Sequence, residues 1–136
     1  MDELKIEAKV ENLDQVLAFV DERLENYDCP MKIQTQIDIA VEEIFVNIAS
    51  YAYAPDSGIA EIGVIISEDP LEVAIVFADS GVPYDPLAKE DPDVTLPAEE
   101  RPIGGLGIYM VKKSMDCVEY EHRDGQNIFT IKKKLS

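Results

Sequence analysis

The sequence lacks the residues on which several classes of protein depend. It contains two cysteines, Cys29 and Cys117, in separate segments without a CxxC pattern, and a single histidine. These counts argue against a disulfide framework and a zinc site and favour a reducing compartment, so we expect a cytoplasmic protein. No apolar run approaches the roughly 20 residues of a membrane span. The acidic, already patterned N-terminus is not typical of a signal peptide.

Positive charge is also scarce. Twelve lysines and arginines stand against 28 aspartates and glutamates, which gives a formal net charge of −16 at pH 7. Such a chain repels nucleic acid phosphates and anionic lipid surfaces, so we expect neither nucleic acid nor membrane as a partner. A basic or mixed protein partner remains compatible with this charge. A small anion would have to be held by backbone N–H groups or by a metal ion.

The length of 136 residues predicts one domain, residues 1–136. With 46% hydrophobic residues, this domain can bury a sizeable core. Helical spacing predicts a helix over 13–24, a second helix after Pro30 and a third that begins at the glycines near 105. Asn12 followed by Gln15 is typical of a capping box. Alternating apolar residues predict strands at 3–10, 58–67, 71–79, 117–123 and 127–135.

The predicted order is β-α-α-β-β-loop-α-β-β. It indicates an α+β fold, a two-layer α/β sandwich in which three helices cover one face of a mixed, mostly antiparallel sheet. A doubly wound dinucleotide-binding fold is disfavoured, because no single helix joins adjacent strands and GGLG lacks the required glycine spacing. Residues 85–103 contain four prolines, six acids and no aromatic residue. Such long loops are lids, binding loops or disordered segments.

Two short patterns place polar side chains beside apolar ones. Glu43 and Asn47 lie one helical turn apart on the same face, at the edge of the apolar stripe. They could border a cleft, or they could belong to an ordinary polar helix surface. Asp79 ends an apolar strand, and Gly81 permits a sharp change of direction after it. Asp79 could accept a hydrogen bond from a buried amino group, or the segment could be a plain turn.

A third pattern is the glycine-rich stretch GGLGIYMVKK at 104–113. Glycines at a helix start let backbone N–H groups approach an anion, and the helix start adds unpaired donors with partial positive charge. This arrangement would allow an acidic chain to hold a polyphosphate. The same glycines would also serve as a hinge for the preceding loop.

Taken together, these patterns resemble the Bergerat-fold ATPases, the GHKL superfamily of gyrase, Hsp90, histidine kinases and MutL. The series is a Glu–x3–Asn helix, Asp-x-Gly after a strand, a proline-rich loop, and Gly-x-Gly at the start of a helix. Within that superfamily, GGLGIYMVKKSMD is similar to the anti-sigma factor serine/threonine kinases. The resemblance covers nearly the whole chain and implies the histidine-kinase-like ATPase fold.

The resemblance implies roles for the residues of the first two patterns. Glu43 would be the catalytic general base, and Asn47 would bind both the nucleotide and Mg²⁺ through its side-chain oxygen. Asp79 would accept a hydrogen bond from the adenine amino group, and Gly81 would let the backbone pass beneath the base. Pro83 stands where the wider superfamily has a second glycine.

The resemblance also implies a phosphate end of the nucleotide site. Gly105, Leu106 and Gly107 would present backbone N–H groups to the phosphates. Residues 85–103 would form the ATP lid, from which Arg101 would reach a terminal phosphate. In relatives, the lid arginine lies closer to the glycines than Arg101 does here.

The implied function is that of an ATP- and Mg²⁺-dependent serine/threonine protein kinase. Its substrate would be a STAS-domain anti-anti-sigma protein in a partner-switching system. A sigma factor as a second partner and a homodimer are compatible with the resemblance. The alternative is a non-catalytic, nucleotide-dependent binding module that sequesters a regulatory partner. A detached histidine-kinase ATPase domain is disfavoured, because neither a dimerisation helix nor a phospho-acceptor histidine accompanies the motifs.

Overall fold

A single sheet is built by segments in which buried and exposed residues alternate. The computed structural model describes residues 1–53, 56–88 and 106–135. Every strand pairing among them is antiparallel, and the order across the sheet is β1-β2-β3-β5-β4. The last strand therefore enters between two others instead of extending an edge. The strands are β1 (Asp2–Glu7), β2 (Ile59–Ser67), β3 (Glu72–Asp79), β4 (Cys117–Arg123) and β5 (Gln126–Lys134).

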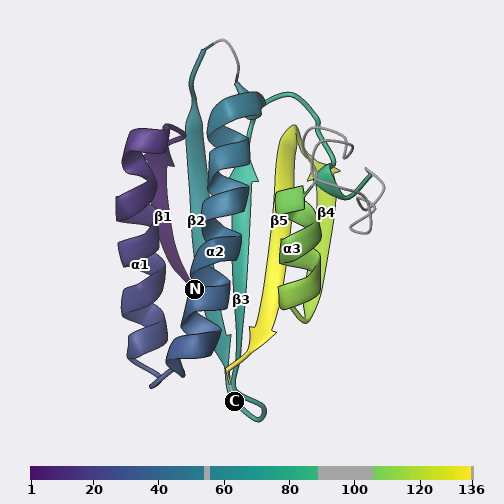
Figure 1. Ribbon diagram of the computed structural model, residues 1–136. Coiled ribbons are helices and arrows are strands. Elements are labelled where there is room, and N and C mark those ends of the chain that lie inside the picture. The colour runs from purple at the N-terminus through teal and green to yellow at the C-terminus, as the bar shows by residue number, and fades with distance from the viewer. Residues whose placement is uncertain (54–55, 89–105, 136) are drawn as a thin grey trace.

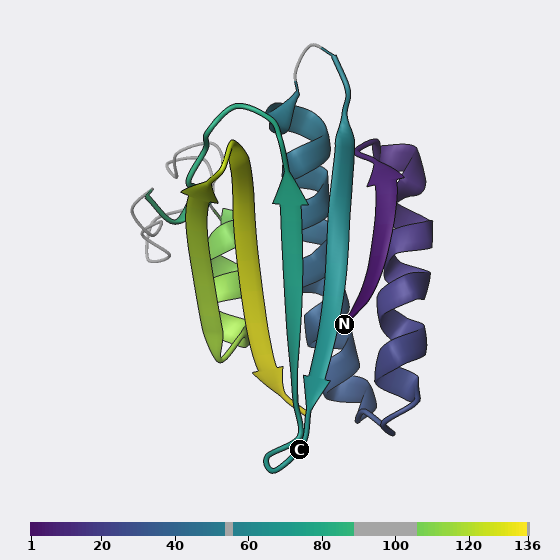
Figure 2. The ribbon, with the colours of Figure 1, turned by 180° about the vertical axis from the view of Figure 1, so that it is seen from behind.

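Three helices lie on one face of this sheet (Figure 1): α1 (Leu13–Glu25), α2 (Met31–Asn47) and α3 (Leu106–Ser114). Viewed from behind, the strands have no described helix in front of them (Figure 2). The predicted α+β, two-layer fold is thereby confirmed. The sheet was expected to be mixed, but among the described strands every pairing is antiparallel. Among the described residues, no helix has both the length and the apolar character needed to cross a membrane. Short helical turns complete the chain: η1 (Val10–Asn12), η2 (Ile48–Ala52) and η3 (Pro86–Ala88).

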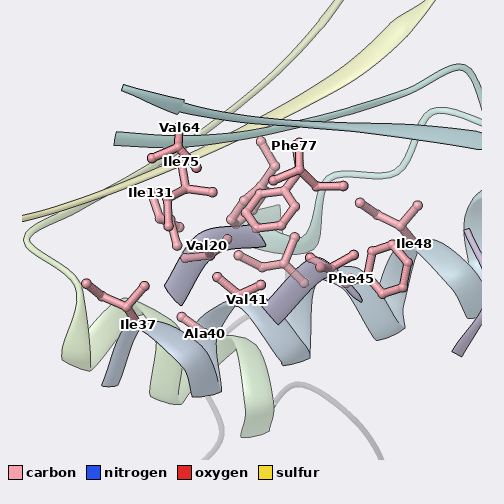
Figure 3. Close-up of a cluster of buried hydrophobic side chains, with 14 of the residues drawn as sticks. Val20, Ile37, Ala40, Val41, Phe45, Ile48, Val64, Ile75, Phe77 and Ile131 are labelled. Atoms are coloured by element: carbon pink, nitrogen blue, oxygen red, sulfur yellow. The ribbon is translucent and has the colours of Figure 1, made fainter. Parts of the chain in front are cut away.

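The core lies between the helices and the sheet, and α2 is its centre. Apolar residues spaced three or four apart along α2 place Ile37, Val41 and Phe45 on one face, and each is fully buried. Figure 3 shows them facing Ile75 and Phe77 of β3. Burial of such side chains contributes about 1.5–3 kcal/mol each, so this layer anchors the C-terminal turn of α2 against the sheet.

The entry into α1 differs from the prediction. The strand expected at 3–10 ends at Glu7, and residues 10–12 form the turn η1, because the Asn12 N–H donates to the Lys9 carbonyl. The expected capping box is also wrong. The Asn12 side chain makes no cap hydrogen bond and instead donates to the Glu7 carbonyl at 2.9 Å. Val10, at 55% exposed, no longer continues the buried alternation of the strand.

The C-terminal hairpin follows its turn residues. Asp124 and Gly125 both have positive φ, 53° and 78°, and they connect β4 directly to β5. Two successive positive φ values are typical of the tight turns that match the twist of a hairpin. This turn sets the register of β5 against β4. On its other side β5 pairs with β3, and there Asn127 lies opposite Asp79.

Candidate active site

A pocket opens where the C-terminal end of α2 meets the ends of β3 and β5. It encloses about 460 Å³ of space, its open mouth included. Two of the predicted site residues, Asn47 and Asp79, line it. Most of the remaining wall is apolar, which suits a flat aromatic group. The apolar side chains include Ile44, Ile48, Phe77, Ile108 and Phe129.

Asp79 is the buried carboxylate of this pocket, with 5% of its surface exposed. Its Oδ1 accepts hydrogen bonds from the Gly81 N–H at 2.9 Å and from Asn127 Nδ2 at 2.9 Å. Within the described part of the chain, no hydrogen bond reaches Oδ2. Because Asp79 lines the pocket, Oδ2 is the oxygen that remains for an amino group of a ligand.

Gly81 lies where the chain leaves β3 and presses against the end of η2. A Cβ atom at this position would overlap the backbone carbonyl of Ala52. The adjacent Val82 N–H donates to that same carbonyl at 2.9 Å. Tyr53 supports the segment from the other side, because its hydroxyl accepts from the Ser80 N–H at 2.8 Å. The predicted change of direction at Gly81 is therefore real, and the glycine is required by a backbone contact.

Glu43 and Asn47 occupy the last turns of α2, as the spacing predicts. Asn47 Nδ2 donates to Glu43 Oε1 at 3.2 Å, so the Asn47 carbonyl oxygen faces away from that bond and is available as a ligand. Gly107, in the first turn of α3, lies directly against the Glu43 carboxylate, where a Cβ atom would overlap it. The structure thus brings together a carboxylate, a carboxamide oxygen and a helix start.

The oxygens of this site fit a Mg²⁺ ion whose other ligands are water and nucleotide phosphates. Among the described residues, no group of three or more His, Cys, Asp or Glu side chains could hold a metal ion. Mg²⁺ prefers oxygen ligands, keeps several waters and is commonly bound by one or two protein oxygens together with substrate phosphates. The Asn47 oxygen meets that requirement when a nucleotide supplies the remaining ligands.

Several predicted site residues lie outside the described residues. Arg101 and Gly105 are among them, as is most of the predicted lid, of which only 85–88 is described. Leu106 is the first residue of α3. Contacts of Arg101, Gly105 and Leu106 with phosphate therefore remain predictions.

Asn127 is the site residue that the sequence reasoning missed. It is 6% exposed and connects Asp79 to Val82, Tyr84 and Tyr120 through hydrogen bonds. A signal was present, because Asn127 occupies the inward-facing position that continues the buried alternation of Phe129. A polar residue at such a position needs a partner, and here that partner is Asp79.

Two tyrosines border the mouth of the pocket. The rings of Tyr51 and Tyr84 lie 6.2 Å apart, tilted by 37°. Tyr120 lies deeper, and burial raises the pKa of its hydroxyl, which therefore stays protonated as a hydrogen-bond donor at neutral pH. The pocket thus combines an apolar interior, one buried carboxylate and an aromatic rim.

Comparisons with known proteins agree with this geometry. The Histidine kinase-like ATPase domain family matches residues 6–133. Serine-protein kinase RsbW of Bacillus cereus strain AH187 is 35% identical over 98 residues, which cover 69% of this chain and 60% of that protein. The protein of the same name from strain B4264 is 36% identical over the same shares. The matched stretch thus spans three fifths of the length of these relatives.

A solved structure shows the same fold. The RsbU and RsbW domains of Rv1364c from Mycobacterium tuberculosis superpose with a TM-score of 0.65 at 17% identity, covering 99% of this chain and 33% of that one. The predicted resemblance to the Bergerat-fold superfamily and its anti-sigma factor kinases is confirmed by these matches. The chain therefore belongs to the histidine kinase-like ATPase domain family, within which it is similar to the serine-protein kinases RsbW.

Proposed function

We propose that the chain is an ATP-dependent serine/threonine protein kinase whose substrate is a STAS-domain anti-anti-sigma protein in a partner-switching system. The observation that supports this most directly is the contact of Glu43 with Gly107. It sets a candidate base against the start of the helix that would face the phosphates. Similarity to serine-protein kinases RsbW supports the class of reaction.

The pocket accounts for the base of the nucleotide. Adenine is flat and largely apolar on its faces, and the pocket wall is mostly aliphatic and aromatic. Asp79 Oδ2 would accept a hydrogen bond from the adenine amino group, since Oδ1 is already engaged by two N–H groups. Gly81 would let the backbone lie close to the base.

The phosphates would lie between α2 and the start of α3. There the unpaired N–H groups of a helix N-terminus favour negative charge. Gly105, Leu106 and Gly107 would supply these donors, and Arg101 would add a positive charge. The Asn47 oxygen would hold Mg²⁺, which, when bound, neutralises charge on the phosphates.

Glu43 would act on the attacking group. Its carboxylate would accept the proton of a serine or threonine hydroxyl as the hydroxyl oxygen bonds to the γ-phosphorus. The bond from that phosphorus to the β,γ-bridging oxygen breaks, and ADP leaves. The hydrogen bond from Asn47 and the contact with Gly107 hold the carboxylate in place for this step.

The surface charge favours a protein partner that is not itself strongly acidic, given the net charge of −16. A sigma factor as a second partner, a homodimer and a cytoplasmic location complete the proposal. Their support is the family alone, because the described residues form no element that is specific for them.

The test uses the purified protein as bait in lysate of its own organism, with Mg²⁺-ATP or Mg²⁺-ADP. We expect a small partner to gain the mass of one phosphoryl group with ATP only. Glu43→Ala should lower transfer by about 100-fold or more while ATP binding remains, because general-base catalysis contributes about 10²–10⁴-fold. Glu42→Ala, which truncates the exposed neighbouring acid, is the matched control.

The other outcomes decide between the alternatives. A partner that is retained according to nucleotide but never modified would favour the sequestering module. Normal transfer by Glu43→Ala would refute its role as the base. If neither capture nor modification of a partner depends on the nucleotide added, the proposed nucleotide site is wrong.

A further inference from the structure

Tyr53 bridges two strands at the point where their pairing stops. The register of β2 and β3 ends at the pair of Ala60 and Asp79. Beyond that pair, the Ser80 N–H donates to the Tyr53 hydroxyl at 2.8 Å, and the hydroxyl donates to the Ile59 carbonyl at 2.7 Å. A side-chain oxygen therefore connects the two strands where a backbone hydrogen bond would otherwise continue the sheet.

The surroundings of Tyr53 fix both its hydroxyl and its ring. A backbone N–H only donates and a carbonyl only accepts, so the hydroxyl accepts from Ser80 and donates to Ile59. The ring lies against Gly58, where a Cβ atom would overlap it. The Gly58 carbonyl in turn accepts from the Ala8 N–H at 2.8 Å, just after β1. Tyr53 is thus attached to the sheet on both sides.

The backbone that carries Tyr53 is a continuation of α2. Asn47 has helical φ and ψ, −62° and −43°, and the N–H of the next residue, Ile48, donates back into α2. The helix therefore passes through Asn47 into the π-helical turn η2, which ends at Ala52. Such turns are frequent at functional sites. A displacement at the end of η2 is thereby transmitted to Asn47 through hydrogen-bonded backbone.

Two hydrogen bonds join this end of the helix to the segment after β3. The Val82 N–H donates to the Ala52 carbonyl at 2.9 Å, and the Ser80 N–H donates to the Tyr53 hydroxyl. They lie on either side of Gly81, which presses against Ala52. Contacts within the protein therefore set the distance between the two ends of the proposed nucleotide site.

We propose that Tyr53 is a positioning residue that holds the base end of the site, at Asp79, at a fixed distance from the phosphate end, at Asn47. The inference rests on the nucleotide site proposed above. Among the described residues, Tyr51 and Ala52 line the pocket and Tyr53 does not, so Tyr53 acts without touching the nucleotide. Its effect is to let one nucleotide reach both ends at once, because a preorganised site binds at lower cost.

Tyr53→Phe removes the bridge and keeps the ring. The Ser80 N–H and the Ile59 carbonyl then pair with water or with each other, and in either case Ser80 is released from Tyr53. The base end itself stays intact, because Asp79 Oδ1 keeps both of its hydrogen bonds. The variant therefore changes the distance between the two ends and leaves the recognition of the base unchanged.

Two ligands measure the two effects separately. Adenosine reaches the base end only, whereas Mg²⁺-ADP reaches both ends, and titration calorimetry or NMR titration gives each Kd. We expect Tyr53→Phe to raise the Kd of Mg²⁺-ADP about tenfold and that of adenosine by less than about twofold. Tyr27→Phe, which changes an exposed tyrosine just after α1, is the matched control and should leave both Kd values unchanged.

The other outcomes contradict the proposal. Equal rises in both Kd values would assign Tyr53 to the base end alone, and no change in either would make it a purely structural residue. Gly58→Ala is a second variant, because the added Cβ atom displaces the Tyr53 ring and its hydroxyl. It should also raise the Kd of Mg²⁺-ADP more than that of adenosine, and it decides the question if Tyr53→Phe does not fold.

A measurement without nucleotide separates a failure of this proposal from a failure of the proposed function. In the ligand-free protein, Tyr53→Phe should shift the NMR resonances of the Asn47 side-chain amide and speed hydrogen exchange of the Val82 N–H. Unchanged Asn47 resonances would show that η2 transmits nothing, and the proposal would be wrong even if ADP binds. Shifted resonances in a protein whose wild type binds neither ligand would remove the proposed nucleotide site, and the positioning role with it, while the connection through η2 would stand.

Discussion

At the scale of single residues, two glycines of the site are required by contacts within the protein. Gly81 lies against the backbone of Ala52, and Gly107 lies against the Glu43 carboxylate. An added methyl group at position 81 would strike backbone, whereas at position 107 it would strike the far end of the Glu43 side chain, which can move. The glycine at 107 therefore does more than free backbone N–H groups, because it allows α3 to approach the acidic side chain on α2. This contact gives Glu43 a defined position before any ligand binds.

Gly107→Ala tests that contact. In an ordinary helix, alanine is more stable than glycine by about 0.5–1 kcal/mol. Here we expect less than that gain in the free energy of unfolding, because the flexible Glu43 side chain must first move its carboxylate away from the new methyl group. Urea unfolding of both proteins measures this difference in the free energy of unfolding.

A double variant checks the cause. Glu43→Ala removes the carboxylate that the new methyl group would strike. In that background, Gly107→Ala should show the full gain of about 0.5–1 kcal/mol. An equal change in the free energy of unfolding in both backgrounds would show that the overlap has no effect.

At the scale of elements, the spacing of apolar residues predicted the long helices and strands well. Each of these elements buries one face, and that burial produces the helical or alternating spacing of its apolar residues. The stripe of α2 and the alternation of β3 are examples, with Ile37 and Phe77 fully buried as expected. The N-terminal strand was predicted too long, because Val10 fits the alternation in sequence but lies beyond the turn at Lys9. The Asn12 cap failed because its side chain had a competing partner in β1, which local sequence does not show.

The sequence predicted those parts of the site in which the interacting residues are close neighbours along the chain. Glu43 and Asn47 are one turn apart in any helix, and their pairing follows from that. The link from Asp79 to Asn127 spans 48 residues and depends on the strand order, which the pattern did not determine. Pairings of that kind arise from tertiary structure and appear only when the sheet is assembled.

Between α1 and α2, the packing includes two acidic side chains. Asp21 on α1 and Asp38 on α2 each have a buried oxygen with no hydrogen-bond partner among the described residues. Burial, a hydrogen bond between protonated Asp38 and Asp21, and the charges of Asp21 and Glu25 together raise the pKa of Asp38 to about 8. The pair therefore holds a proton in the folded state that an unfolded chain would release.

Asp38→Asn should change the pH dependence of stability. The folded pKa of Asp38 lies above its unfolded value, so the folded state binds more protons, and stability falls as pH rises from about 4 to about 8. We expect Asp38→Asn to be more stable than wild type at pH 9 and to show a shallower pH dependence, by urea unfolding at pH 5, 7 and 9. Asp14→Asn, on the exposed first turn of α1, is the control and should keep the wild-type slope.

At the scale of the whole molecule, charge is the dominant property. A net charge of −16 on 136 residues makes the compact state repel itself. The described ion pairs offset little of this repulsion, because most are surface contacts such as that between Lys5 and Glu61, at 3.8 Å. Exposed pairs contribute about 0–1 kcal/mol each.

Salt should therefore stabilise the protein at neutral pH. Raising NaCl from about 20 mM to about 200 mM shortens the screening length severalfold, and we expect Tm to rise by several degrees. Thermal denaturation followed by circular dichroism measures the shift. Near pH 4.2, the isoelectric point of the sequence, the same salt increase should have little effect. An equal rise at both pH values would point to a salt effect other than screening.

Among the described strands, β5 comes last along the chain, yet it lies inside the sheet, between β3 and β4. As the chain leaves the ribosome, Asp79 emerges nearly 50 residues before Asn127, with which it forms a hydrogen bond. Phe129, which lines the pocket from β5, also emerges after Asp79. Until that strand is released, the sheet has a gap beside β3 and the pocket has no back wall. A nascent chain thus cannot hold a ligand in the finished pocket before β5 has been released.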